Sequence, residues 1–207
     1  MHDVRGFRMA RAALIALSLL PLAVSAAPRT WVIDPEHFSI SFGVEHAGFA
    51  EVMGLFQEAE GQFVYDPETR ELESGEVTVQ ADSVFTAHKE RDKHVRDGDF
   101  LDADAHPEIR FVATGYEPQG EDRGELRGEL TLLGETRPVT LDVRINRMGE
   151  YPFGGSLFND PPYVIGISAK TTIQRSEWGM TYGVEDDIVG DAVDLRFELE
   201  ARRQEDD

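Results

Sequence analysis

The sequence predicts an all-β domain, folded as an antiparallel barrel or sandwich of eight or nine short strands. The first observation is alternation: apolar residues at 193, 195, 197 and 199 alternate with charged residues at 194, 196, 198 and 200. Side chains alternate across a strand, so this spacing gives one apolar and one wetted face. The second observation is that Gly, Pro and Asp separate such segments, as in all-β domains.

The strand pattern recurs eight times along the chain. The segments are residues 36–45, 55–65, 73–81, 108–116, 124–133, 137–146, 163–173 and 191–201. Turn signals lie between neighbouring segments, at residues 66–69 (DPET), 120–122 (GED) and 134–136 (GET). The last of these is short enough to make a tight hairpin. We therefore expect the connected strands to be antiparallel neighbours.

Two stretches break the β pattern and predict short helices in connecting loops. Residues 46–52 suggest a helical turn that closes one end of the barrel. Residues 83–101 are longer and polar, and on a helix Lys89, Lys93 and Arg96 would lie on one side. Asp92 is spaced to pair with Arg96 on the same helix. This segment holds the densest basic cluster of the chain.

The first 26 residues have the pattern of an export signal. Arg5, Arg8 and Arg11 form a basic start, an apolar stretch follows, and small residues at 24–26 form a cleavage site. The apolar stretch is about half of the roughly 20 residues that a membrane-spanning helix needs. We expect cleavage after Ala26, and one domain over residues 27–207. A signal of this type predicts a periplasmic protein.

Charge and cysteine content exclude several classes of function. The chain carries a formal charge of −20, which becomes −22 without residues 1–26. Such a surface repels phosphate backbones, so nucleic acid is not an expected partner. Cysteine is absent, which excludes disulfides, a thiol nucleophile and Cys-ligated metals. Nothing in the fold then depends on an oxidising compartment.

An apolar inner face must be buried against something. An eight-stranded barrel is just wide enough to be filled by its own side chains or to hold one small ligand. Large aromatic rings are frequent among the inward positions. Candidate residues for the lining of a ligand cavity are Phe42, Val44, Phe56, Phe63, Phe85, Phe100 and Phe111.

Several segments together resemble the YceI family of exported, lipocalin-like proteins. They are DPEHFSISF at 34–42, VMGLF at 52–56, RDKHVRDGDFLD at 91–102, HPEIRF at 106–111, GELTLLGETRPV at 128–139 and IQRSEWGM at 173–180. The resemblance covers nearly all of the chain after residue 26. It implies an extended, lipocalin-like, eight-stranded antiparallel barrel whose long apolar cavity binds a polyisoprenoid chain, such as an isoprenoid quinone or a prenyl diphosphate. It also implies that two copies can pair as a homodimer.

Basic residues near the expected mouth of the barrel are candidates for binding a headgroup. Guanidinium groups make paired hydrogen bonds to phosphate oxygens. The candidates are Lys89, Arg91, Lys93, His94 and Arg175. Two structural interpretations compete with this one. The helix could be a solvated surface on which Glu90 and Asp92 balance the basic residues, and Arg175 could anchor a loop.

Metal and enzyme interpretations find less support. Asp97, Asp99, Asp102, Asp104 and His106 are close in sequence but do not follow the spacing of an EF-hand. The histidines at 88, 94 and 106 are too widely spaced for a helical zinc pair. We therefore name no metal ligand, no cofactor and no catalytic residue.

The function that we predict is non-catalytic binding, and sequestration or transport, of a polyisoprenoid lipid in the periplasm, with transient contact to a membrane. Two alternatives remain open. One is a stress-related interaction protein whose barrel is filled by its own side chains. The other is a barrel-based hydrolase or isomerase.

Overall fold

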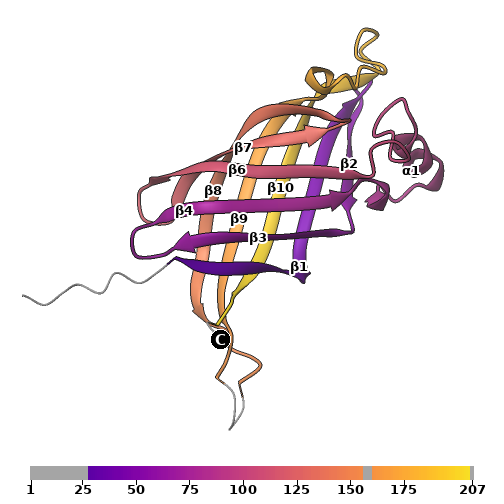
Figure 1. The fold of residues 1–207 in the computed structure, drawn as a ribbon. Helices are drawn as coiled ribbons and strands as arrows, with labels where there is room; N and C mark the ends of the chain where they lie inside the picture. Colours follow the sequence, from indigo (N-terminus) through magenta and orange to yellow (C-terminus); the bar gives the residue numbers. More distant parts are fainter. Residues whose placement is uncertain (1–27, 156–159, 206–207) are drawn as a thin grey trace, which may run out of the picture.

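Eight antiparallel strands close into a barrel in the computed structural model, which describes residues 28–155 and 160–205 (Figure 1). The strands of the closed barrel follow the order β10-β9-β8-β7-β6-β4-β3-β1, and β1 pairs with β10 to complete the ring. Closure leaves few strand edges free to pair with other chains. The export signal expected at residues 1–26 lies outside the described residues.

The barrel strands are long, and tight turns join β3 to β4, β6 to β7 and β7 to β8. Their bounds are β1 (Arg29–His46), β3 (Ala59–Asp66), β4 (Glu71–Gln80), β6 (Glu108–Gln119), β7 (Arg123–Leu132), β8 (Glu135–Glu150), β9 (Tyr163–Gln174) and β10 (Val189–Arg203). β1 extends past β3 and pairs there with β2 (Ala50–Phe56), which in turn pairs with the two-residue β5 (Val84–Phe85). Seven of the eight expected segments each fall on a single strand, whereas the segment at 55–65 spans the end of β2 and most of β3. The antiparallel barrel is confirmed.

Within residues 28–155 and 160–205, helical structure lies in the connections between strands. The helix α1 (Lys89–Arg96) forms within the polar segment expected to be helical. There are also two 3-10 turns, η1 (Ala81–Ser83) and η2 (Arg175–Trp178). His88 caps α1, since its Nδ1 accepts a hydrogen bond from the backbone N–H of Arg91 at 3.3 Å. Short helices between long strands match the predicted fold class.

The helical turn expected at residues 46–52 is wrong. This segment is the hairpin between β1 and β2, and the N–H of Phe49 donates to the carbonyl of His46 at 3.0 Å. Ala47 and Gly48 have φ angles of 51° and 71°, which turn the chain back into β2 instead of continuing it as a right-handed helix. Apolar residues on both sides of the turn imitate helical spacing.

Asp92 and Arg96 make their hydrogen bonds to other groups, and the pKa of Asp92 is lowered first by the Thr86 hydroxyl and to a smaller extent by the charge of Arg96. Asp92 is buried and accepts hydrogen bonds from the N–H and the hydroxyl of Thr86, at 2.6 and 2.5 Å. Arg96 donates instead to the carbonyls of Asp82 and Val84, at 2.6 and 2.8 Å. Both residues thus fasten α1 to the strand end that precedes it.

The interior of the barrel consists of two halves with different packing. In the packed half, Trp31 is fully buried, stacks on Phe63 with a centroid distance of 6.2 Å, and donates from its indole N–H to the carbonyl of Tyr65 at 3.2 Å. Ile165 and Ala201 complete the centre of this cluster. Dense packing of this kind supplies much of a barrel's stability. The other half of the interior, toward α1, contains the cavity described below.

A charged cluster spans an irregularity in β1, between Ile33 and Phe38. Asp34 is 7% exposed and accepts hydrogen bonds from the N–H of Glu36 (3.1 Å), His37 Nδ1 (3.1 Å) and Arg202 (2.6 Å). Burial opposes ionisation, yet these hydrogen bonds outweigh it and lower the pKa of Asp34. The same hydrogen bond from His37 to Asp34 raises the pKa of His37. The two shifts have opposite signs because each partner stabilises the other's charge.

This cluster predicts a pH window for its contribution to stability. His37 contributes fully below its ordinary pKa of 6.5, and this contribution is lost as the pH rises through its raised pKa. Asp34 contributes above its ordinary pKa of 3.8, and this contribution is lost as the pH falls through its lowered pKa. In an NMR titration, Asp34→Asn should return the pKa of His37 toward 6.5, whereas Asp194→Asn on the outer wall should not. A His37 pKa that stays raised in Asp34→Asn contradicts the assignment.

Candidate ligand-binding cavity

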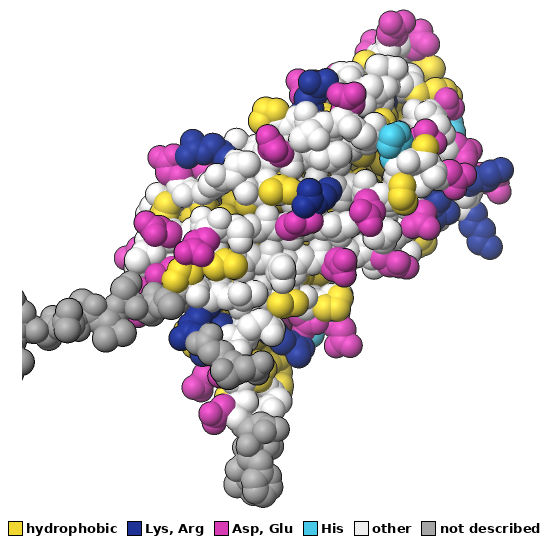
Figure 2. Space-filling model, in the orientation of Figure 1, with side chains coloured by type: hydrophobic (Ala, Val, Ile, Leu, Met, Phe, Trp, Pro, Cys, Tyr) yellow, Lys and Arg dark blue, Asp and Glu magenta, His cyan; other side chains and the backbone are white. Residues whose placement is uncertain are grey.

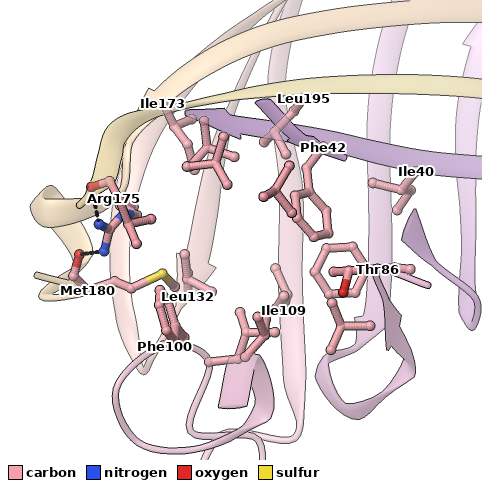
Figure 3. A pocket seen from close by; sticks show the side chains of 18 of the residues that line it. Ile40, Phe42, Thr86, Phe100, Ile109, Leu132, Ile173, Arg175, Met180 and Leu195 are labelled. Atoms are coloured by element: carbon pink, nitrogen blue, oxygen red, sulfur yellow. Dashed lines mark hydrogen bonds between the residues drawn. The ribbon is translucent and has the colours of Figure 1, made fainter. Parts of the chain in front are cut away.

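A hydrophobic cavity of about 580 Å³ occupies the half of the barrel nearest α1. It lies within the range of volumes typical of small-molecule sites. Inward-facing apolar side chains from the strands form its wall, and Figure 3 shows ten labelled residues converging on the hollow. The wall includes Ile40, Phe42, Val44, Phe56, Val77, Val79, Ile109, Phe111, Leu130, Leu132, Val139, Leu141, Ile173, Val193, Leu195 and Phe197.

Two strand glycines make room for the largest rings of this wall. Gly54 lies directly opposite Phe42 in the pairing of β2 with β1, and a Cβ atom built on Gly54 would stand only 2.1 Å from the Phe42 ring. Gly128 lies under the Phe111 ring in the same way, at 2.2 Å. The tips of both rings therefore occupy the space that a side chain would fill at these glycines.

The mouth of the cavity is bounded by α1 and by the segment that joins η2 to β10. His94 from α1, Phe100 and Tyr182 form a cluster of three rings, with centroid distances of 5.0, 5.1 and 5.2 Å. His94 Nε2 is also 2.9 Å from a carboxylate oxygen of Asp99. All three ring residues line the cavity. The aromatic contacts therefore join two segments that are distant in sequence at the cavity mouth.

Arg175 holds the second of these segments in place. Its side chain is 2% exposed, and it donates to the carbonyls of Gly190 (2.8 Å), Met180 (2.7 Å), Tyr182 (2.8 Å) and Val189 (2.8 Å) (Figure 3). Burial lowers the pKa of the guanidinium, although arginine stays charged in proteins. The charge also lies 5.7 Å from the centre of the Phe100 ring. These contacts support the expectation that Arg175 anchors a loop.

The structure places five of the seven predicted cavity residues in the lining: Phe42, Val44, Phe56, Phe100 and Phe111. Phe63 does not line the cavity, because it faces inward at the level of the packed half and stacks on Trp31. Phe85 does not line it either, because β5 lies beside β2 outside the closed ring and leaves the side chain 41% exposed. Contact of the five lining residues with a ligand stays a prediction.

The predicted headgroup residues divide in a similar way. Arg91, His94 and Arg175 line the cavity, whereas Lys89 and Lys93 do not and are exposed on α1. Arg91 also donates to the hydroxyl and the carbonyl of Thr86, at 2.8 and 2.7 Å. On the face shown in Figure 2, acidic side chains are numerous and basic side chains are sparse. Several of the basic side chains gather beside α1. The helix α1 therefore places basic side chains beside the mouth, whose lining also includes the carboxylates of Glu45 and Glu90.

Other polar residues at the mouth were not predicted from the sequence. Glu45, His46, His88 and Glu90 line this end of the cavity. They adjoin strand ends and the helix cap, where the chain turns and alternation no longer indicates direction. In the described ranges, no group of three or more His, Cys, Asp or Glu side chains is placed to hold a metal ion. No helix within those ranges is long and apolar enough to cross a bilayer.

The fold and the cavity define a lipocalin-like barrel, closed by its own strands and hollow at one end, of the class that can enclose a small hydrophobic molecule. The sequence model of the protein family described as the YceI-like domain matches residues 31–201 of this chain. The chain belongs to this family.

Relatives and solved structures agree with this assignment. A UPF0312 protein of Pectobacterium carotovorum is 35% identical over 170 residues, covering 81% of this chain and 84% of the relative. A UPF0312 protein of Shewanella is 38% identical over 172 residues, covering 82% and 85%.

Among solved structures, the YCEI protein of Campylobacter jejuni has a TM-score of 0.69 at 27% identity and covers 78% of this chain and 90% of its own. A polyisoprenoid binding domain from Saccharophagus degradans has a TM-score of 0.60 at 13% identity and covers 84% and 98%. At that identity the second likeness shows the fold alone.

Proposed function

We propose that the protein binds a polyisoprenoid lipid, an isoprenoid quinone or a prenyl phosphate, and sequesters it or carries it through the periplasm without catalysing a reaction. The observation that carries this proposal is the apolar cavity of about 580 Å³ inside a barrel with a strongly acidic sequence. A methyl-branched chain suits such a wall, because shape and burial determine its fit. Membership in the YceI-like family and the shared fold of the polyisoprenoid binding domain from Saccharophagus degradans support the same class of ligand.

The energy available from such burial is sufficient for a carrier. Removing several hundred Å² of hydrocarbon surface from water gains on the order of 10 kcal/mol at about 25 cal/mol per Å². Association and ordering reduce this gain. A barrel filled by its own side chains, the first alternative, does not fit the hollow half. Export, transient membrane contact and pairing as a homodimer stay predictions.

The test is extraction of the purified protein with organic solvent, followed by mass spectrometry. The protein should be produced with its signal in a Gram-negative host and purified without detergent. A prenyl lipid in near-stoichiometric amount supports the proposal. Protein that yields no such lipid, and that takes up neither a quinone nor a prenyl phosphate when either is added, contradicts it.

The basic residues of α1 predict how the headgroup affects affinity. Replacing Lys89, Arg91 and Lys93 together by Gln removes three positive charges from α1, one of them on the cavity lining and two on the exposed side of the helix. We expect prenyl diphosphate to bind roughly tenfold more weakly, because screened charge pairs at a surface each contribute up to about 1 kcal/mol. A quinone with the same chain should be affected less than twofold. Titration of both ligands at low salt measures the difference.

A matched control separates local from overall charge. The variant with Arg144, Lys170 and Arg196 changed to Gln removes the same charge from the exposed outer wall of the barrel. It should change the affinity for both ligands by less than twofold. Equal weakening of the diphosphate by both triple variants would show that these α1 residues have no specific role in headgroup binding.

A further inference from the structure

The cavity ends inside the barrel instead of passing through it. Val77 and Phe111 line its inner end, and Val77 also packs against the Trp31 cluster. Phe111 packs against the buried cluster of Leu141, Val143 and Ala169, and Tyr116 packs against the same cluster. The ring of Tyr116 in turn meets that of Tyr65 edge-on at 6.2 Å. Interiors packed in this way leave few voids larger than a water molecule. A chain that enters at the mouth therefore meets a floor about halfway along the barrel.

The hollow above this floor holds a limited number of atoms. At about 30 Å³ per non-hydrogen atom, the share of one molecule in liquid water, 580 Å³ accommodates roughly 20 atoms. Four isoprene units contain this number of carbon atoms. The depth of the hollow is limited as well, since its lining on β1 runs from Ile40 to His46. At about 3.3 Å per residue and a strand tilt of about 40°, they are separated by roughly 15 Å along the barrel axis.

We propose that the packed half of the barrel is a stop that limits the buried length of a polyisoprenoid to about four isoprene units. This inference rests on the proposed function, because it assumes that the cavity takes a prenyl chain. Longer chains bind with the additional units outside the mouth, where they gain little from burial. Val77 and Phe111 set the position of the stop.

Variants at the floor should move the limit in opposite directions. Phe111→Ala removes six ring carbons and makes room for about one more unit at roughly 30 Å³ per atom. Val77→Phe adds four carbons and removes room for nearly one unit by the same measure. Phe153→Ala is the matched control, because Phe153 is 72% exposed and is not among the lining residues.

The experiment measures displacement of N-phenyl-1-naphthylamine by prenyl alcohols of two to six units. For the wild-type protein, affinity should rise at least tenfold for each unit up to four and less than threefold for each unit beyond, because only buried carbons contribute. The break should move to five units in Phe111→Ala and to three in Val77→Phe, and stay at four in Phe153→Ala. Long prenyl alcohols associate with one another in water, which lowers their apparent affinity. Because this affects every protein equally, each variant is compared with the wild-type protein for the same alcohol.

The outcomes distinguish the stop from the proposed function itself. Affinity that continues to rise at an undiminished rate to six units, or a break that moves in neither variant, overturns the stop but leaves lipid binding in place. Failure of every alcohol to displace the probe overturns lipid binding and the stop with it. If Phe111→Ala does not fold, the wild-type series and Val77→Phe still decide the question.

Discussion

Replacing Arg175 by methionine is expected to lower the free energy of unfolding by about 3 to 5 kcal/mol. The buried guanidinium donates to two backbone carbonyls of the segment between η2 and β10 and to two at the start of β10. Hydrogen bonds to a charged group contribute about 1.5 to 3 kcal/mol each, although such values do not add. Methionine fills part of the volume but donates none of these hydrogen bonds. Urea unfolding followed by circular dichroism measures the loss.

Two further variants make this result specific. Arg175→Lys should recover only a small part of the loss, because an ammonium group lacks the planar fork that reaches several carbonyls at once. Arg196→Met, at an exposed position on β10, should change stability by less than about 0.5 kcal/mol. An Arg175→Met protein as stable as Arg196→Met would show that the guanidinium does not hold this segment.

Substituting Gly54 by valine is expected to weaken the binding of a prenyl ligand at least tenfold. The new side chain occupies the space of the Phe42 ring, which lines the cavity, so the ring must move off the wall into the hollow. Losing two or more buried carbon contacts at about 0.8 kcal/mol each accounts for this factor. Overpacking should lower stability by no more than about 3 kcal/mol. Probe displacement by a prenyl alcohol of four units measures the affinity.

The control for this substitution is another strand glycine. No atom outside the adjoining residues lies within 4 Å of a Cβ built on Gly115 in β6, so Gly115→Ala should leave affinity within twofold of wild type. Gly54→Ala should give an intermediate loss, since one methyl group displaces the ring less than an isopropyl group does. Unchanged affinity in Gly54→Val would mean that the Phe42 ring is not part of the binding surface.

Most of the barrel was predictable because its signal is local. Alternation over a few residues fixes which side of a strand is apolar, and the segments at 108–116 and 163–173 lie within β6 and β9. The start of β1 was missed, since the irregularity after Ile33 interrupts the alternation at the Asp34 cluster. Strand existence therefore follows from the sequence more reliably than strand length does.

The position of a side chain along the barrel axis was less predictable. Alternation places both Phe63 and Phe111 inside, but only the register between strands puts Phe63 against Trp31 and Phe111 at the cavity. The role of Arg175 depends on carbonyls between 5 and 15 residues away in sequence. Such contacts exist only after the chain has folded, so no local pattern indicates them.

The division of the interior into a packed half and a hollow half bears on how this protein can evolve. Stability and binding specificity usually compete, because a site that must stay open removes contacts from the core. Here the buried centre of the Trp31 cluster lies outside the cavity lining, and Val77 is the contact between the two. Substitutions at half-buried lining residues such as Val139 and Leu195 can therefore change the shape of the hollow without touching the Trp31 cluster.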